Sequence, residues 1–337
     1  MPGVGNGIGI PFTKSGGGGA VGSTDFVFEV DTTQAGSASD TFVLPLHATG
    51  VYNFNVQWGD GNDDDITVWN QAETTHVYAV GGTYTITITG QIEGWFFANT
   101  GDDDKITNIS NWGSLVITLK WAFYGCSNLD ISATDAPTIT TTTFEYMFRG
   151  CSSLTNPDFS KWDTSTVTYC LGVFQLCPLF NGNVSTWDMS NVTFMQSMFN
   201  SCSVFNGDIS GWDVGLNTDA VTMFFNNQAF NQDIGGWDMS SVTRIKYMLY
   251  NADAFDQSLA NWTVTQMTDM TNFMTSATGM STANYDALLI AWDAQGTMSF
   301  SGTANFGGSQ YTSGGAAEAA RTSLISKWGG ITDGGAA

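Results

Sequence analysis

The sequence predicts a mixed β/α protein in which a small β-sandwich is followed by a parallel repeat solenoid with a helical C-terminal cap. The main observation is that one set of tryptophans and one set of phenylalanines each recur every 25 residues. These are Trp162, Trp187, Trp212, Trp237 and Trp262, and Phe180, Phe205, Phe230 and Phe255. A fixed period of this length is typical of solenoids, in which each coil buries its apolar face against its neighbours. Upstream of the repeats, apolar residues alternate with polar ones, as they do in half-buried strands.

We expect four parts in chain order: a glycine-rich arm over 1–22, a sandwich over 23–98, the solenoid over 99–280 and a capping segment over 281–337. Within the arm, only Ile8, Ile10, Pro11 and Phe12 offer apolar contact. A glycine-rich terminus is seldom ordered alone. These four residues are therefore predicted to anchor the arm to a neighbouring subunit.

Three alternating apolar runs between residues 24 and 97 predict antiparallel strands. Tight-turn signals separate them, as in Trp58-Gly59-Asp60-Gly61. Together with His76-Val77-Tyr78 and Gly82-Thr83-Tyr84, this set resembles the PKD-like immunoglobulin sandwich. The resemblance covers roughly 70 residues. It implies an immunoglobulin-like β-sandwich that serves as an extracellular spacer or as a glycan- or protein-binding module.

Clustered carboxylates in this region are candidate calcium ligands. Calcium takes oxygen ligands, and Asp60, Asp63 and Asp65 could supply them from one turn. Their spacing does not match an EF-hand loop, so solvated turns are the preferred interpretation. No other metal site and no cofactor is expected.

In each repeat, the half before the phenylalanine carries a helical stripe. In one repeat this stripe consists of Val192, Met195, Met198, Phe199 and Cys202. A helix of about two turns would need the stack to stabilise it. The half that ends in tryptophan is predicted to add one short strand per coil to a parallel ladder.

Four of the five cysteines keep the repeat spacing: Cys126, Cys151, Cys177 and Cys202. Side chains in register along a stack run parallel, whereas a disulfide or a zinc site needs groups that converge. Asn227 and Ala252 take the same place in later coils. We therefore predict a column of buried free thiols.

The repeat also matches a known pattern. Met198-Phe199-x-x-Cys202, Phe205-Asn206, Ile209-Ser210 and Trp212-Asp213 resemble the BspA-like leucine-rich-repeat surface proteins, including the repeat called DUF285. The resemblance covers residues from about 105 to 280 and implies a leucine-rich-repeat-like solenoid of about seven 25-residue coils. Two apolar helical faces, near 285–292 and 316–328, are predicted to cover its open end.

Composition excludes several functions. The chain has 9 basic and 31 acidic residues and a formal net charge of −22, which repels nucleic acid and anionic membranes. No apolar run is long enough for a membrane span. The N-terminus lacks the basic head and apolar core of a secretory signal. Either a signal has been removed, or the protein reaches the outside by lysis or assembly.

Catalysis is not the favoured function. Most aspartates recur at the same place in each repeat, whereas a catalytic centre would be expected in one repeat alone. The residues that vary between coils are the candidate binding residues: Tyr169, Phe194, Arg244 and Tyr247. We therefore expect a non-enzymatic structural and recognition protein. The first hypothesis is a bacteriophage head or tail fibre or decoration protein on the virion surface, held by its arm to virion proteins or to further copies of itself. It would present the solenoid to a host glycan or protein.

Two alternatives remain. One is a bacterial cell-surface adhesin of the BspA-like type. The other is a tailspike-like glycan hydrolase that uses acids outside the repeat pattern: Asp135, Glu145, Asp158, Asp219, Asp253 and Asp269.

Overall fold

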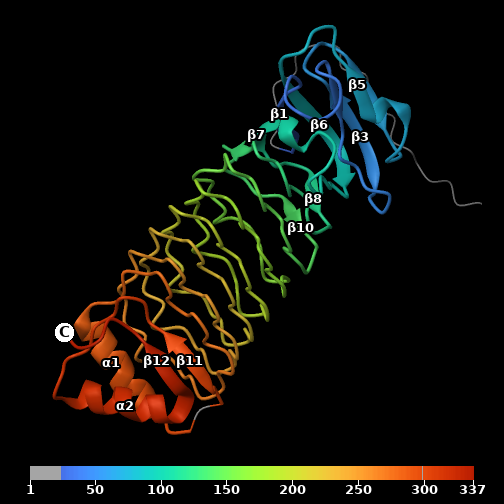
Figure 1. Ribbon diagram of the computed structural model, residues 1–337. Coiled ribbons are helices and arrows are strands. Elements are labelled where there is room, and N and C mark those ends of the chain that lie inside the picture. Colours follow the sequence, from blue (N-terminus) through green and yellow to red (C-terminus); the bar gives the residue numbers. More distant parts are fainter. Residues whose placement is uncertain (1–23, 298) are drawn as a thin grey trace, which may run out of the picture.

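The protein is an elongated molecule. Its computed structural model describes residues 24–297 and 299–337. A β-rich region forms one end, stacked repeats form the middle, and two helices with a short strand pair form the other end (Figure 1). The stacked repeats, residues 118–280, are called the repeat stack below.

The N-terminal end is built around one mixed eight-stranded sheet. Its strands are β1 (Phe26–Asp31), β3 (Tyr52–Gln57), β4 (Asp63–Ile66), β6 (Thr83–Glu93), β7 (Ile106–Asn111), β8 (Leu115–Ile117), β9 (Asp130–Ile131) and β10 (Thr138–Ile139). A separate antiparallel pair is formed by β2 (Thr41–Val43) and β5 (Thr75–Val77), and two short 3-10 helices occupy Ala72–Thr74 and Asp103–Lys105.

Strand β6 connects this sheet to the first repeats. Because Ile88 pairs with both Phe26 of β1 and Val56 of β3, those two strands lie on opposite edges of β6, both antiparallel to it. The end of β6 pairs in parallel with β8, and β8 pairs in parallel with β10. On the other side β1 pairs with β7, which continues in parallel to β9. The sheet therefore passes from antiparallel pairing into the parallel pairing of the repeats.

The predicted immunoglobulin-like sandwich is wrong for this reason. The alternating strands are present, but they enter a mixed sheet that runs on into the repeats, and only the small β2–β5 pair stands apart from it. The alternation of apolar residues indicates strands that are buried on one face, and it does not specify which edges are free.

The repeat stack carries very little regular secondary structure. All of its residues are described, and they contain no α-helix and only the two-residue strands β9 and β10. Successive repeats are joined by isolated parallel bridges, such as Tyr169 with Phe194 and Asp219 with Arg244. In Figure 1 the repeats lie over one another as a series of parallel turns of chain.

One nine-residue stretch of each repeat, called a turn segment here, carries most of the bonds between repeats. The seven turn segments are 118–126, 143–151, 169–177, 194–202, 219–227, 244–252 and 269–277. Between the fourth and fifth of them, the N–H groups of Met195, Ser197, Phe199 and Ser201 donate to carbonyls of the next repeat. The N–H groups that alternate with them close turns onto residues three positions earlier, as Cys202 does to Phe199. Every second amide therefore joins repeats, and the others shape the turns.

This geometry explains why the predicted helix is wrong, although the residues of its apolar stripe are buried. The fourth and eighth residues of each turn segment have positive φ, as in Ser197 at 59° and Ser201 at 61°. A right-handed helix cannot contain such residues. Consecutive turns nevertheless bring Met195, Met198 and Phe199 to the interior, so the same apolar spacing arises without a helix.

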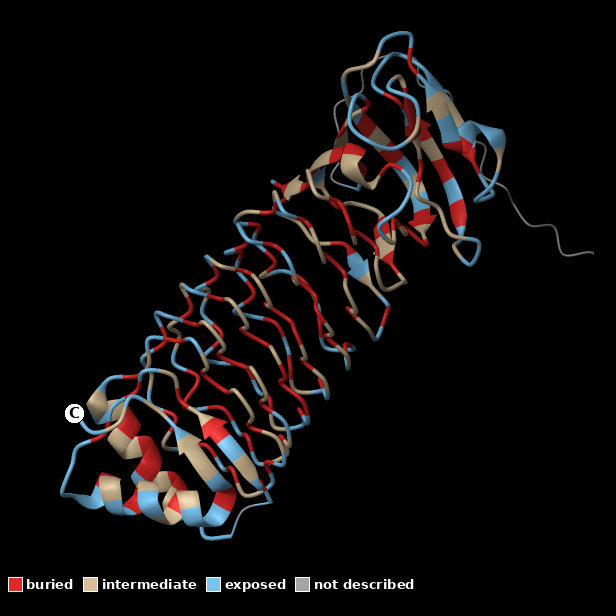
Figure 2. Cartoon of the chain, viewed as in Figure 1, coloured by how far each residue is buried: buried red, intermediate tan, exposed pale blue. Residues whose placement is uncertain are grey.

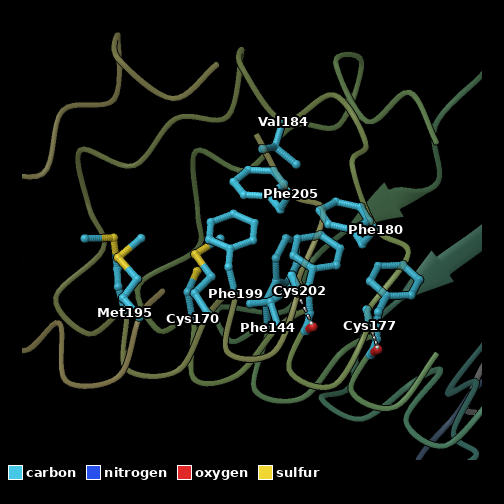
Figure 3. Packing of buried hydrophobic residues seen from close by; sticks show 14 of the residues in the cluster. Phe144, Cys170, Cys177, Phe180, Val184, Met195, Phe199, Cys202 and Phe205 are labelled. Atoms are coloured by element: carbon cyan, nitrogen blue, oxygen red, sulfur yellow. Dashed lines mark hydrogen bonds between the residues drawn. The ribbon is translucent and has the colours of Figure 1, made fainter. Parts of the chain in front are cut away.

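The interior of the stack consists of columns of equivalent residues. The rings of Phe148, Phe174 and Phe199 stack with 5.7 Å between successive centroids. The centroids of the Phe199 and Phe205 rings lie 4.0 Å apart, and Figure 3 shows these rings close together, with Phe180 and Cys177 further along the stack. The prediction for the cysteines is confirmed: all five are free and buried.

Polar atoms in these columns bond to the preceding repeat. The indole N–H groups of Trp187, Trp212, Trp237 and Trp262 each donate to a backbone carbonyl 28 residues earlier, over 2.8–3.2 Å. The Sγ atoms of Cys177 and Cys202 donate in the same direction, to the carbonyls of Phe148 and Phe174, each over 2.9 Å. Burial and hydrogen bonding thus favour the same register.

The C-terminal segment closes the stack with both helices and strands. Helix α1 (Thr282–Asp293) and helix α2 (Ala316–Trp328) lie where the apolar faces predict them. Between and after them, β11 (Gly302–Asn305) and β12 (Gly329–Thr332) form a parallel pair. Met274 of the last repeat donates its N–H to the carbonyl of Asn305, so β11 caps the final turn segment. A purely helical cap was therefore the wrong expectation.

One continuous hydrophobic cluster runs from Phe26 to Trp328. Figure 2 shows buried residues along the interior of the whole length and exposed ones at its rims and loops. Taken together, the predicted fold class of a sandwich, a seven-coil leucine-rich-repeat solenoid and a helical cap is wrong. The described residues form a mixed eight-stranded sheet, two two-stranded sheets, two α-helices, two short 3-10 helices and a stack of turns.

Candidate binding surface

The aromatic side chains that remain partly exposed in the repeat stack gather on one surface. Most side chains at the first, third, fourth and seventh positions of the turn segments are partly exposed, and the surface that these positions form is called the aromatic face here. It holds all eight partly exposed aromatic residues of the stack: Trp121, Tyr124, Tyr146, Tyr169, Phe194, Phe225, Tyr247 and Tyr250. Rings with one solvated side and polar neighbours are common in recognition surfaces.

Three of the four predicted binding residues lie in a single column of this face. Tyr169, Phe194 and Arg244 occupy the first position of successive turn segments, with Asp219 between the last two. The rings of Tyr169 and Phe194 stack at 4.8 Å and 9°. Arg244 Nη1 lies 2.9 Å from Asp219 Oδ2, which places an ion pair next to the stacked rings.

A cluster at the N-terminal end of the face combines rings and cations. The Arg149 guanidinium lies 5.1 Å from the ring of Tyr124 and 4.8 Å from that of Tyr146, and its Nη1 donates to the Tyr124 hydroxyl over 2.9 Å. Lys120 lies 4.3 Å from the ring of Trp121. These contacts hold the rings and cations in fixed positions before any ligand binds.

A second cluster lies at the C-terminal end of the face. Here Tyr247, the fourth predicted residue, contacts the rings of Phe225 and Tyr250, which stack on each other at 4.6 Å. Lys246 lies 5.3 Å from the ring of Tyr247. The two clusters and the Tyr169–Phe194 pair thus form a row along the stack.

Three of these aromatic residues have an unfavourable backbone conformation. Trp121, Tyr146 and Tyr247 have φ values of 63°, 51° and 55°, in the left-handed region. Bulky residues seldom adopt this conformation, which costs about 1–2 kcal/mol. Other repeats have Gly172, Ser197 or Asn272 at the same position. The stack therefore does not require an aromatic residue there.

Comparison with known proteins agrees with the repeat pattern. A family model described as "Mycoplasma protein of unknown function, DUF285" matches residues 91–193 and 170–287, which together make up more than half of the chain. The chain belongs to the DUF285 family. No curated protein and no solved structure matches it. The DUF285 part of the predicted resemblance is confirmed, whereas the match supports neither the PKD-like region nor the leucine-rich-repeat detail.

The sequence prediction missed five aromatic residues of this DUF285 surface: Trp121, Tyr124, Tyr146, Phe225 and Tyr250. Aligning the repeats on the left-handed positions would have found them, because all five then fall on the fourth or seventh residue of a turn segment. The predicted helical stripe also left these positions outside the core, but Tyr247 was the one aromatic residue predicted there.

The calcium candidates do not converge on one point. Asp60 Oδ2 lies 2.9 Å from His76 Nε2, while Asp63 and Asp65 both accept hydrogen bonds from the side-chain amide of Asn55. Within residues 24–297 and 299–337, no group of three or more histidine, cysteine or acidic side chains could hold a metal.

The acids outside the repeat pattern serve local structure. Asp135 accepts the backbone N–H groups of Trp112 and Gly113, and Asp158 accepts that of Ser160. Glu145 pairs with Lys120, with 3.0 Å between charged atoms. Asp253 accepts the N–H of Thr278, and Asp269 accepts that of Thr271. The structure gives each of these carboxylates a hydrogen-bonding role within the stack.

Two further findings concern the chain ends and membranes. The predicted anchor Ile8, Ile10, Pro11 and Phe12 lies outside the described residues. In the part of the chain that the structure describes, neither helix has the length and apolar character to cross a membrane.

Proposed function

We propose that this DUF285 protein is a non-enzymatic recognition protein displayed on a bacterial surface, and that it binds glycans through the aromatic face. The observation that carries the proposal is the placement of Trp121, Tyr146 and Tyr247 on left-handed backbone. Strain of this kind persists where the surrounding structure enforces it, and it is common at functional sites. These three rings are only partly buried, so we seek the benefit that offsets this cost in binding as well as in packing.

Glycan binding suits the composition of this surface. Gln196 and Asn200 belong to the same turn segment as Phe194, whose ring stacks on that of Tyr169, and their amides can bond sugar hydroxyls. A sugar ring has an apolar face and a polar rim, which matches flat aromatic rings with amides beside them.

Surface display is supported by the family membership and by the predicted BspA-like resemblance. The virion alternative depended on residues 1–22, which are not described, and it stays a prediction. The hydrolase alternative also stays a prediction, and the local hydrogen bonds of the candidate acids give it no support.

The binding proposal can be tested on a glycan array with substitutions that the repeats themselves suggest. Tyr146→Gly and Tyr247→Asn introduce the residues found at Gly172 and Asn272, so the double variant should fold at least as stably as the parent. We expect it to lose at least tenfold in glycan affinity. The matched control, Leu179→Ala with Leu216→Ala, removes exposed apolar side chains elsewhere and should bind normally.

The binding proposal would be refuted if the parent protein bound no glycan on the array. It would also be refuted if the Tyr146→Gly/Tyr247→Asn variant bound glycans as tightly as the parent does. Display is tested separately with antibodies against the repeat stack. They should label intact cells, and labelling of lysed cells alone would exclude a surface location.

A further inference from the structure

We propose that the ligand is an extended acidic polysaccharide, and that Arg149 and Lys246 bind carboxylates on two separate sugars of one chain. This inference rests on the proposed function, because it assigns a ligand class to the same aromatic face. It follows from the distribution of charge, from the unpaired donors and from the spacing of the two cations.

The charge of the aromatic face differs from that of the rest of the molecule. The turn segments contain four basic residues, Lys120, Arg149, Arg244 and Lys246, and three acidic ones. The whole chain, by contrast, has nine basic residues and 31 acidic ones. Charges beyond about 8 Å are largely screened at physiological salt, so a bound anion senses the local cations more than the distant acids.

Two of the four cations have no acidic partner. Lys120 and Arg244 pair with Glu145 and Asp219. Neither Arg149 nor Lys246 takes part in any ion pair formed by the described residues. In so acidic a chain, carboxylates are plentiful, so two cations left without one on the same face require an explanation.

Arg149 is prepared to bind an anion. Its guanidinium lies beside two tyrosine rings and donates one hydrogen bond, to Tyr124. Its Nε is buried and has no hydrogen-bond partner among the described residues. A guanidinium held in place with donors unused matches the two oxygens of a carboxylate. Because Nε has no exposed surface, a carboxylate would reach the guanidinium through its Nη groups.

Lys246 repeats this arrangement at the other end of the face. The ammonium group of Lys246 is near Tyr247. Lys246 lies in the sixth turn segment, at its third position, and Arg149 lies in the second turn segment. Four repeats separate them, which corresponds to roughly 19 Å at about 4.8 Å per repeat. A single small anion cannot reach both cations, whereas one extended polymer chain can.

The surface between them favours a polysaccharide over an acidic peptide. A peptide that binds through its backbone adds a strand to an open edge. Alternate backbone amides of the turn segments already donate to the next repeat, and the others close turns. What this region offers instead is the Tyr169–Phe194 ring pair and amide side chains such as Gln196.

The test uses polygalacturonate and its carboxyl-reduced, neutral counterpart, with poly-glutamate as an acidic peptide. Affinities of the full chain are measured by biolayer interferometry. We expect binding to polygalacturonate at least tenfold tighter than to either other polymer, and weakening as salt rises. The double variant Arg149→Gln/Lys246→Gln should lose at least tenfold. The control Lys161→Gln/Lys327→Gln removes the same charge away from the face and should bind normally.

Equal affinity for the neutral polymer would overturn the inference, as would normal binding by the Arg149→Gln/Lys246→Gln variant. Equal or tighter binding to poly-glutamate would overturn the choice of a polysaccharide. Failure of the proposed function looks different: Tyr146→Gly/Tyr247→Asn would then leave binding to all three polymers unchanged. If Tyr146→Gly/Tyr247→Asn loses affinity for both acidic and neutral glycans, while Arg149→Gln/Lys246→Gln keeps its affinity for both, only the present inference fails.

Discussion

Two tryptophans of the same column differ in one hydrogen bond, which permits a sharp test of what stabilises the stack. Trp212 Nε1 donates to the carbonyl of Val184 over 3.1 Å, whereas Trp162 Nε1 is buried without a partner. Both side chains are nearly inaccessible to solvent. Substituting each with phenylalanine removes a similar amount of ring, but only one substitution breaks a bond.

The expected difference can be worked out from these contacts. Trp212→Phe removes one buried hydrogen bond, which is worth about 1 kcal/mol. The Val184 carbonyl keeps its bond from the Trp187 amide, so no further penalty arises. Trp162→Phe removes an unpaired buried N–H, which relieves about 1 kcal/mol or more of desolvation. The Trp162 ring also contacts Trp112, Phe144 and Phe159, and Trp212 has no counterpart of these contacts, so Trp162→Phe loses more packing and part of the difference is offset. We therefore expect Trp212→Phe to be less stable than Trp162→Phe by about 1 kcal/mol.

The measurement is urea unfolding followed by far-UV circular dichroism, since tryptophan fluorescence changes with the substitutions themselves. Equal m-values are required for the comparison. Equal stability of the two variants, or lower stability of Trp162→Phe, would show that the indole–carbonyl bonds do not contribute to the stack as reasoned here.

Three further predictions follow from the repeats and from buried groups. Deleting 188–212, one whole repeat, joins Trp187 to Asp213 in register, so the protein should still unfold cooperatively, whereas deleting 188–200 should abolish the native circular dichroism spectrum. Burial raises the pKa of all five cysteine thiols, that of Cys177 to about 12, so iodoacetamide at pH 8 should label none of them in the native protein, as read by mass spectrometry. Burial and then the charge of Asp104 raise the pKa of Asp103 to about 6, so Asp103→Asn should raise the free energy of unfolding at pH 8 by about 1 kcal/mol, with allowance for partial exposure.

The sign of the Asp103 effect follows from proton linkage. Its pKa is higher in the folded state than its ordinary value of 3.8, so its contribution to stability is complete below pH 3.8 and is lost as pH rises through about 6. The advantage of Asp103→Asn should therefore shrink as pH falls from 8 towards 4. An advantage that is independent of pH would contradict this account. Cooperative unfolding of the 188–200 deletion variant would contradict the prediction for the repeats. Labelling of Cys202 by iodoacetamide in the native protein would contradict the prediction for the thiols.

The sequence period identified which residues are buried but not the local backbone. Trp212, Phe205 and Cys202 were assigned to interior columns because they recur every 25 residues, and all are buried. The helical interpretation failed because apolar spacing at three and four residues also arises from consecutive turns. What distinguishes the two is the left-handed backbone at Ser197 and Ser201, and serine gives no signal of it in a single sequence.

The candidate surface was only partly predictable for the same reason. Tyr169, Phe194 and Arg244 were found because they vary within one aligned position, which does not depend on the type of secondary structure. Arg149 was missed, since its significance lies in two adjacent tyrosine rings and in having no ion pair among the described residues, and both depend on three-dimensional neighbours.

The bonds between turn segments have a mechanical consequence. They run along the length of the molecule, and each repeat is held only by the ones next to it. A load applied across the two ends would therefore detach one repeat at a time from an end of the stack. Each step would release 25 residues, or about 80 Å of extended chain. A tether built this way lengthens in increments under tension and dissipates work at each one.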